Sequence, residues 1–183
     1  MARQPYPETT GPDHLRHGRA HRSPDTIGAM ELRGREGNAL TLSIVGYRFP
    51  DQAVDPWESN ALLVALRVVS PHGTWEVVDP CLTTWEAAEL ASLLTAFAVT
   101  GDRMAATLTA PNLTVSASAA TASTIALRAC FELEQRPPWL AAVGGDGELC
   151  VDLEVSTGDA VVAAASLRDD LVRFPQRGDD PTI

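Results

Sequence analysis

Apolar and polar residues alternate along several stretches of this chain, and a period of two is typical of β-strands that bury one face. The alternation is clearest over residues 125–134 and returns over residues 148–155. Further strands are predicted over residues 39–49, 61–70, 74–78, 104–109 and 113–117. The turn sequence Ser-Pro-His-Gly at residues 70–73 makes the second and third of these an antiparallel hairpin.

Two other stretches carry apolar residues at helical spacing. The first should begin near Thr84, because Thr83 and Glu86 have the spacing of a capping box, and it should end near Ala98. Its apolar stripe comprises Leu90, Leu93, Leu94 and Phe97. The second helix is predicted over residues 159–174, with Ser156 and Asp159 available to cap its start.

The stretch that joins strand to helix, residues 75–86, is expected to form a buried corner. Asp79-Pro80 should stop the strand, since proline lacks the N–H that a central strand needs. Trp139, directly after a Pro-Pro pair, is expected to fold its connection back onto the sheet.

These elements predict an α+β domain: a meandering antiparallel sheet of about six or seven strands, with two helices packed on one face. A single domain is expected over residues 30–177. Residues 1–29 lack periodicity and predict a disordered tail, and residues 178–183 a polar tail. The sequence leaves open whether translation starts at Met1 or at Met30.

The charge balance narrows the class of partner. The 183 residues include 24 acidic side chains and 14 arginines without lysine, for a formal net charge of −10. Such a chain repels nucleic acid and attracts basic protein surfaces, although acidity also serves plain solubility. No apolar run is long enough for a membrane span.

The three cysteines, Cys81, Cys130 and Cys150, are odd in number and widely spaced. This argues against a disulfide framework or a zinc site and favours the reducing cytoplasm. We expect no cofactor and no metal.

Catalytic motifs are missing from the sequence, which predicts a protein that is not an enzyme. Cys81 with His72 could form a nucleophile and base, but a buried thiol and a turn histidine are the simpler interpretation. Glu132 and Glu134 could form a carboxylate pair, yet nothing nearby predicts a cleft.

If the last two strands are neighbours, Glu132, Glu134, Asp152 and Glu154 would lie together on the open face of the sheet. These four acids are the candidate partner-binding residues. The alternative is an ordinary solvated sheet face.

Several motifs, in this order, resemble the WapI-like immunity protein family. They are Gly-Tyr-Arg-Phe-Pro at residues 46–50, Asp-Pro-Cys-Leu-Thr-Thr-Trp-Glu at 79–86, Pro-Asn-Leu at 111–113, Phe-Glu-Leu-Glu-Gln-Arg-Pro-Pro-Trp at 131–139 and Arg-Phe-Pro at 173–175. The family is named for the immunity partner of a contact-delivered toxin that cleaves transfer RNA. The resemblance implies a cytoplasmic protein that binds a toxin domain and blocks it.

A basic nuclease cleft is a surface that an acidic protein can cover without catalytic residues, so the charge agrees with this resemblance. Two other functions stay open: a non-catalytic adaptor or regulatory domain with a different partner, and an enzyme of unrecognised type. The sequence leaves the oligomeric state, the cognate toxin and the true contact surface undetermined.

Overall fold

The computed structural model describes residues 28–51, 55–100, 106–110, 112–119, 121–141, 147–179 and 181. Most of the predicted N-terminal tail, residues 1–27, lies outside them. The elements are β1 (Met30–Arg33), β2 (Ala39–Tyr47), α1 (Pro56–Asn60), β3 (Ala61–Ser70), β4 (Gly73–Thr83), α2 (Thr84–Thr100), β5 (Ala106–Ala110), β6 (Leu113–Ala119), β7 (Thr124–Phe131), the 3-10 turn η1 (Leu133–Gln135), α3 (Pro138–Ala141), β8 (Leu149–Ser156) and α4 (Thr157–Arg173).

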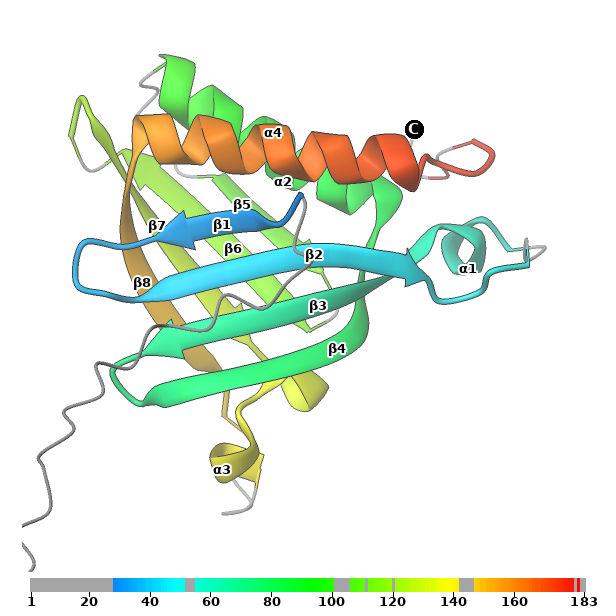
Figure 1. Ribbon diagram of the computed structural model, residues 1–183, viewed down its shortest axis with the longest axis horizontal. Coiled ribbons are helices and arrows are strands. Elements are labelled where there is room, and N and C mark those ends of the chain that lie inside the picture. The colour runs from blue at the N-terminus through cyan, green and yellow to red at the C-terminus, as the bar shows by residue number, and fades with distance from the viewer. Residues whose placement is uncertain are drawn as a thin grey trace, which may run out of the picture.

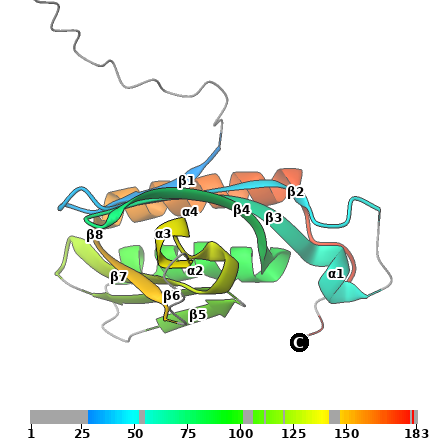
Figure 2. The ribbon, with the colours of Figure 1, turned by 90° about the horizontal axis from the view of Figure 1, so that it is seen from below.

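The strands form two antiparallel sheets of four, in the orders β1-β2-β3-β4 and β5-β6-β7-β8. We call them the N-terminal and C-terminal sheets; they lie in two layers (Figures 1 and 2). The predicted α+β class is confirmed, but the single sheet of six or seven strands is wrong. Alternation shows only that each strand buries one face, so it cannot distinguish one sheet under helices from two sheets facing each other.

One hydrophobic core joins both sheets and the helices. The rings of Trp75 on β4 and Phe131 on β7 meet edge to face across the layers, with centroids 5.4 Å apart. Helices α2 and α4 pack along one side of the two layers rather than on one face of a sheet, as Figure 1 shows. The predicted helix placement is therefore also wrong, because the facing sheet already covers that surface.

Local signals in the sequence located the helix starts correctly. Oγ1 of Thr83 accepts a hydrogen bond from the N–H of Glu86 at 3.3 Å, and the Glu86 carboxylate accepts the Thr83 N–H at 2.7 Å. Ser156 caps α4 by accepting the Asp159 N–H at 3.0 Å. The predicted capping box and the predicted second cap are both confirmed.

The β3–β4 hairpin closes at Ser70 and Gly73, as predicted, but β4 continues through Pro80 to Thr83. The prediction that Asp79-Pro80 stops this strand is wrong. β4 is an edge strand, where the N–H that proline lacks is not needed for pairing. A β-bulge follows, because Leu62 pairs with Leu82 and Leu63 with Pro80, which leaves Cys81 as the extra residue.

β7 ends at Phe131, three residues earlier than the alternation predicts. Leu133 adopts φ 47° and is 58% exposed, so the chain leaves the sheet there instead of burying that side chain. Beyond the turn, the Trp75 indole N–H donates to the Gln135 carbonyl at 3.0 Å. Trp139 packs edge to face on Trp75 at 5.7 Å, which confirms its predicted anchoring role.

Cys130 and Cys150 form a disulfide, and the prediction that the cysteines build no disulfide is wrong. The two residues stand directly opposite each other on β7 and β8. Their separation of 20 residues gave no sign of this pairing, whereas strand register brings them together.

Candidate protein-interaction surface

The outward face of the C-terminal sheet carries a groove of about 430 Å³. Small side chains of β6 and β7, among them Ser116, Ser118 and Ala126, form its floor. Charged residues of β7 and β8 and the tip of the β1–β2 hairpin form its walls. The groove is open and shallow, so it suits contact with a surface better than enclosure of a small molecule.

The wall exists because the hairpin tip hydrogen-bonds to the free edge of β8. The Arg35 N–H donates to the Glu154 carbonyl at 3.2 Å, and Asn38 Nδ2 donates to the Asp152 carbonyl at 2.9 Å. Gly34 permits this approach, since a Cβ there would lie 3.3 Å from the Cα of Leu153. The tip thereby covers part of an edge strand and connects the two sheets.

The structure places Asp152 and Glu154 in this groove, each beside an arginine. Arg128 binds Asp152 through two hydrogen bonds of 2.9 and 3.2 Å. Arg35 Nη1 lies 3.2 Å from Glu154 Oε1. Both pairs are solvent-exposed, so they stabilise the fold little, but they offset the negative charge that the sequence suggested.

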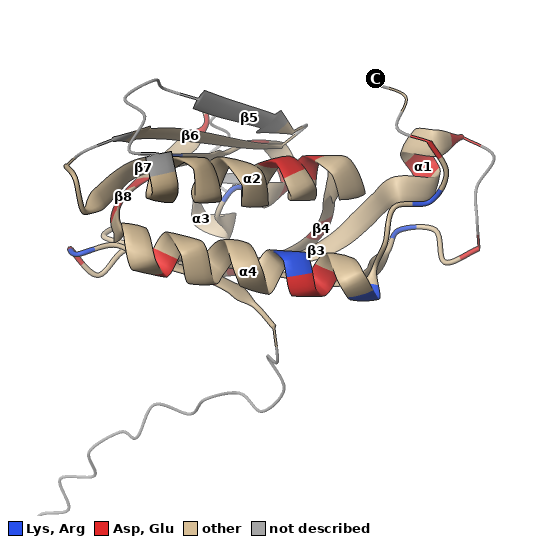
Figure 3. Ribbon diagram, turned by 90° about the horizontal axis from the view of Figure 1, so that it is seen from above, with Lys and Arg blue, Asp and Glu red and all other residues tan. Residues whose placement is uncertain are grey.

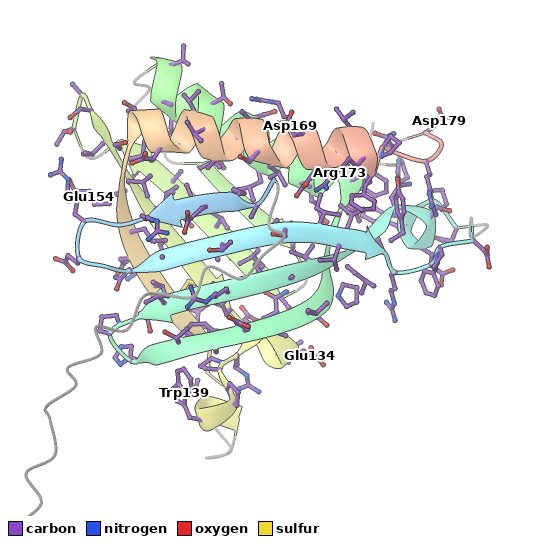
Figure 4. The ribbon with its side chains drawn as sticks, viewed as in Figure 1. Glu134, Trp139, Glu154, Asp169, Arg173 and Asp179 are labelled. Carbon is purple, nitrogen blue, oxygen red and sulfur yellow. A yellow bond between two sulfur atoms is a disulfide. The ribbon has the colours of Figure 1, made fainter. Side chains whose placement is uncertain are left out.

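Glu132 and Glu134 lie elsewhere, after the end of β7, and Figure 4 shows Glu134 and Glu154 on separate parts of the molecule. Both glutamates contact Asn112 of the Pro-Asn-Leu turn: its carbonyl accepts the Glu132 N–H at 3.0 Å, and its Nδ2 donates to Glu134 Oε2 at 3.0 Å. The same Nδ2 lies 3.3 Å from Asp79 Oδ2. The four candidate acids therefore form two sites.

We call these the groove site (Glu36, Asp152 and Glu154) and the Asn112 site (Asp79, Glu132 and Glu134). Sequence reasoning missed Glu36 and Asp79 because both come from distant segments. Residues 111–113 were recognised as a family motif, but the asparagine gave no sign of binding two acids. In contrast, α2 carries acidic but no basic residues and α4 carries both, among many uncharged positions, as Figure 3 shows.

A second hollow, of about 230 Å³, lies beside α1 and the corner that precedes α2. Its lining includes Arg48, Phe49 and Trp57, and Trp57 is 47% exposed while its ring meets Trp85 edge to face at 5.0 Å. Tryptophan and arginine are frequent anchors of protein interfaces. Much of its lining belongs to the motifs at residues 46–50 and 79–86, to which the sequence analysis assigned no binding site.

The structure does not bring Cys81 and His72 together as a catalytic pair. Cys81 is buried, and burial raises the pKa of its thiol to about 12, against a smaller opposing effect of a hydrogen bond with Gln135. His72 lies in the exposed β3–β4 turn, nine residues away along an extended strand, which corresponds to roughly 30 Å. Cys81 therefore behaves as a core residue.

Comparisons with known proteins identify the family. The model of the immunity protein WapI-like family matches residues 31–175, most of the chain. No curated protein and no solved structure gives a significant match. Within the described residues, no helix is long and apolar enough to cross a membrane. The chain belongs to the WapI-like immunity protein family, as its motifs predicted.

Proposed function

We propose that this protein binds a toxin domain, a nuclease with a basic active surface, and neutralises it in the cytoplasm by covering that surface. Membership of the family indicates a role in toxin immunity, and this is the observation that carries the proposal. The nuclease activity, the basic surface and the compartment are the finer parts that we propose.

The charge of the chain supports a basic partner. A net charge of −10 steers a positively charged domain toward the protein and raises the rate of association, most strongly at low salt. A nuclease domain must attract phosphates, so its substrate-binding surface carries the opposite sign. Covering it would prevent RNA from binding without any chemistry on the part of the inhibitor.

We propose that Glu132, Glu134, Asp152 and Glu154 contact the toxin from two sites. In the groove site, Arg35 and Arg128 already offset Glu154 and Asp152. In the Asn112 site, the carboxylates of Asp79 and Glu134 accept hydrogen bonds from one neutral amide, and Glu132 is held to the same residue by its backbone N–H. Because arginines offset Asp152 and Glu154 in the groove site, we give the Asn112 site the larger share of the electrostatic attraction.

Co-expression tests the function directly. A candidate toxin domain, sought among the genes beside this one, would be expressed in a bacterial host with and without this protein, and growth and transfer RNA integrity would be measured. We expect full protection and a one-to-one complex whose affinity falls as salt is added. Loss of growth despite abundant folded protein would contradict the immunity function.

The same experiment distinguishes an adaptor from an immunity protein. A stable complex that leaves the nuclease active, or a partner that is no toxin, would favour an adaptor. Protection combined with salt-independent affinity would retain immunity and reject the acidic contact surface. In that case the aromatic hollow at Trp57 would be the next surface to mutate.

A further inference from the structure

Three potential metal ligands meet on the outward face at one end of the β7–β8 pair. Cys130 and Cys150 are cross-strand partners, and Glu148 precedes Cys150 by two residues. Their two sulfur atoms and a carboxylate oxygen all lie within 4.8 Å of one another. Among the described residues, no other cluster of three or more such side chains has this geometry.

We propose that the reduced cysteines and Glu148 bind a thiophilic divalent cation of the zinc class, and that the disulfide is the metal-free, oxidised form of the same site. This site is independent of the proposed toxin contact. The sequence analysis predicted neither a disulfide nor a bound metal in this part of the sheet.

The strand register supplies the spacing that such a cation needs. Two thiolates that each bind Zn²⁺ at about 2.3 Å in a tetrahedron lie roughly 3.8 Å apart. The Cα atoms of Cys130 and Cys150 are 4.0 Å apart, so both sulfurs can reach one ion without separation of the strands. A carboxylate is an accepted third ligand, and water can take the fourth position.

The ligand types select the class of cation. Thiolate sulfur favours zinc and similar ions over calcium and magnesium, which require sets of oxygen ligands. Glu148 is exposed and Cys150 partly exposed, so an ion can reach these two ligands from solvent, while Cys130, at 7% exposure, is the buried ligand of the three. Cys81 is in a different position: it is buried in the core and has no part in the cluster.

The conversion between the two forms balances with a small-molecule thiol as reductant. Two such thiols give two electrons and two protons to the Cys130–Cys150 bond and leave as their own disulfide. The products are two cysteine thiols. A divalent cation then binds both sulfurs as thiolates and releases their two protons.

Cobalt titration tests the proposal, because thiolate-to-cobalt charge transfer reports sulfur ligation directly. The full chain would be reduced with excess thiol, freed of it under anaerobic conditions and titrated with Co²⁺. We expect one ion per chain, a charge-transfer band and tetrahedral d–d bands, and loss of these bands when Zn²⁺ is added. The oxidised protein should give none of them.

Variants separate this site from other ligands. Cys130→Ser with Cys150→Ser should abolish the charge-transfer band, and Glu148→Gln should weaken binding by about tenfold. Glu89→Gln, which changes an exposed acid on α2 outside the cluster, is the matched control and should bind like the wild type. Circular dichroism would verify that each variant is folded.

Three results would overturn the proposal. The first is the absence of a charge-transfer band in the reduced wild-type protein at stoichiometric cobalt. The second is an unchanged band in the double serine variant, and the third is an affinity of Glu148→Gln equal to that of Glu89→Gln.

Discussion

The backbone N–H of Ile44 donates a hydrogen bond of 3.2 Å to Oδ2 of Asp170, a residue 126 positions later in the chain. β1 begins only at Met30, opposite Leu42, so β2 continues beyond the start of its neighbour. The carboxylate of Asp170, on α4, therefore accepts a hydrogen bond that a longer β1 would have accepted. Because Asp170 is fully buried, this bond fixes the helix on the N-terminal sheet in an environment without competing water.

Asp170→Ala should destabilise the fold by about 3 kcal/mol, because it leaves a buried N–H unpaired and removes the ion-pair partner of Arg173. Chemical denaturation would measure the change in the free energy of unfolding. Asp169→Ala is the matched control: Asp169 is the exposed neighbour on the same helix and should change stability by less than about 0.5 kcal/mol. Equal effects of the two substitutions would show that the buried bond contributes nothing.

The capping box at the start of α2 gives a second stability prediction. Glu86 accepts hydrogen bonds from both the N–H and the hydroxyl of Thr83, at 2.7 and 2.8 Å. Glu86→Ala should therefore cost about 1 kcal/mol in the free energy of unfolding. Glu89→Ala, at an exposed position one turn further along the helix, should leave thermal unfolding nearly unchanged. A larger effect at Glu89 than at Glu86 would contradict the capping role.

Cys81 predicts a loss of stability at alkaline pH. Burial raises the pKa of its thiol from 9.0 to about 12, so between these values the thiol of the unfolded chain ionises while that of the folded chain stays neutral. The unfolded state gains stability as pH rises through this window, and the folded state loses its advantage. In Cys81→Ala this contribution to the pH dependence should disappear.

Alkylation provides the second measurement for Cys81. The thiol should react slowly in the native protein and rapidly in denaturant, since only the exposed thiolate is a good nucleophile. Rapid native reaction at neutral pH would show that the residue is accessible and that the raised pKa is wrong.

Local chemistry in the sequence predicted most individual elements. The capping box at Thr83 and Glu86, the turn at Ser70 to Gly73 and the alternation of β8 each depend on neighbouring residues, and each is confirmed. The predictions failed where contacts between distant segments of the chain determine the structure. β1 has four residues, too few for periodicity to be recognised, and the two facing sheets produce the same alternation as one.

For the candidate acids, too, local patterns placed some residues correctly and long-range contacts displaced others. The pairing of β7 with β8 was the condition for placing the four acids together; the two strands do pair, and this sets Asp152 opposite Arg128. The turn at Leu133, which separates Glu134 from that face, depends on burial of Gln135 and on the Trp75 bond to its carbonyl. No local sequence pattern predicts such a contact. The partner-binding role of the four acids stays a prediction.

Charge reversal at the two acidic sites tests that role. Glu132→Arg with Glu134→Arg should reduce affinity for a basic toxin domain by about tenfold or more, mainly through slower association. Asp152→Arg with Glu154→Arg should also weaken binding, but by a smaller factor, because Arg128 and Arg35 already offset these acids. Association and dissociation rates would be measured at two salt concentrations.

Glu76→Arg is the control for both double variants, because Glu76 is exposed and ion-paired with Arg67 at 3.0 Å on the outward face of the other sheet. Glu76→Arg changes the net charge by two, and each double variant changes it by four. If only the net charge mattered, each double variant would therefore lower the logarithm of the affinity twice as much as Glu76→Arg. A loss beyond this proportion locates the contact at the mutated site. Proportional losses in all three variants would mean that the acidity of the whole protein, rather than either site, attracts the toxin.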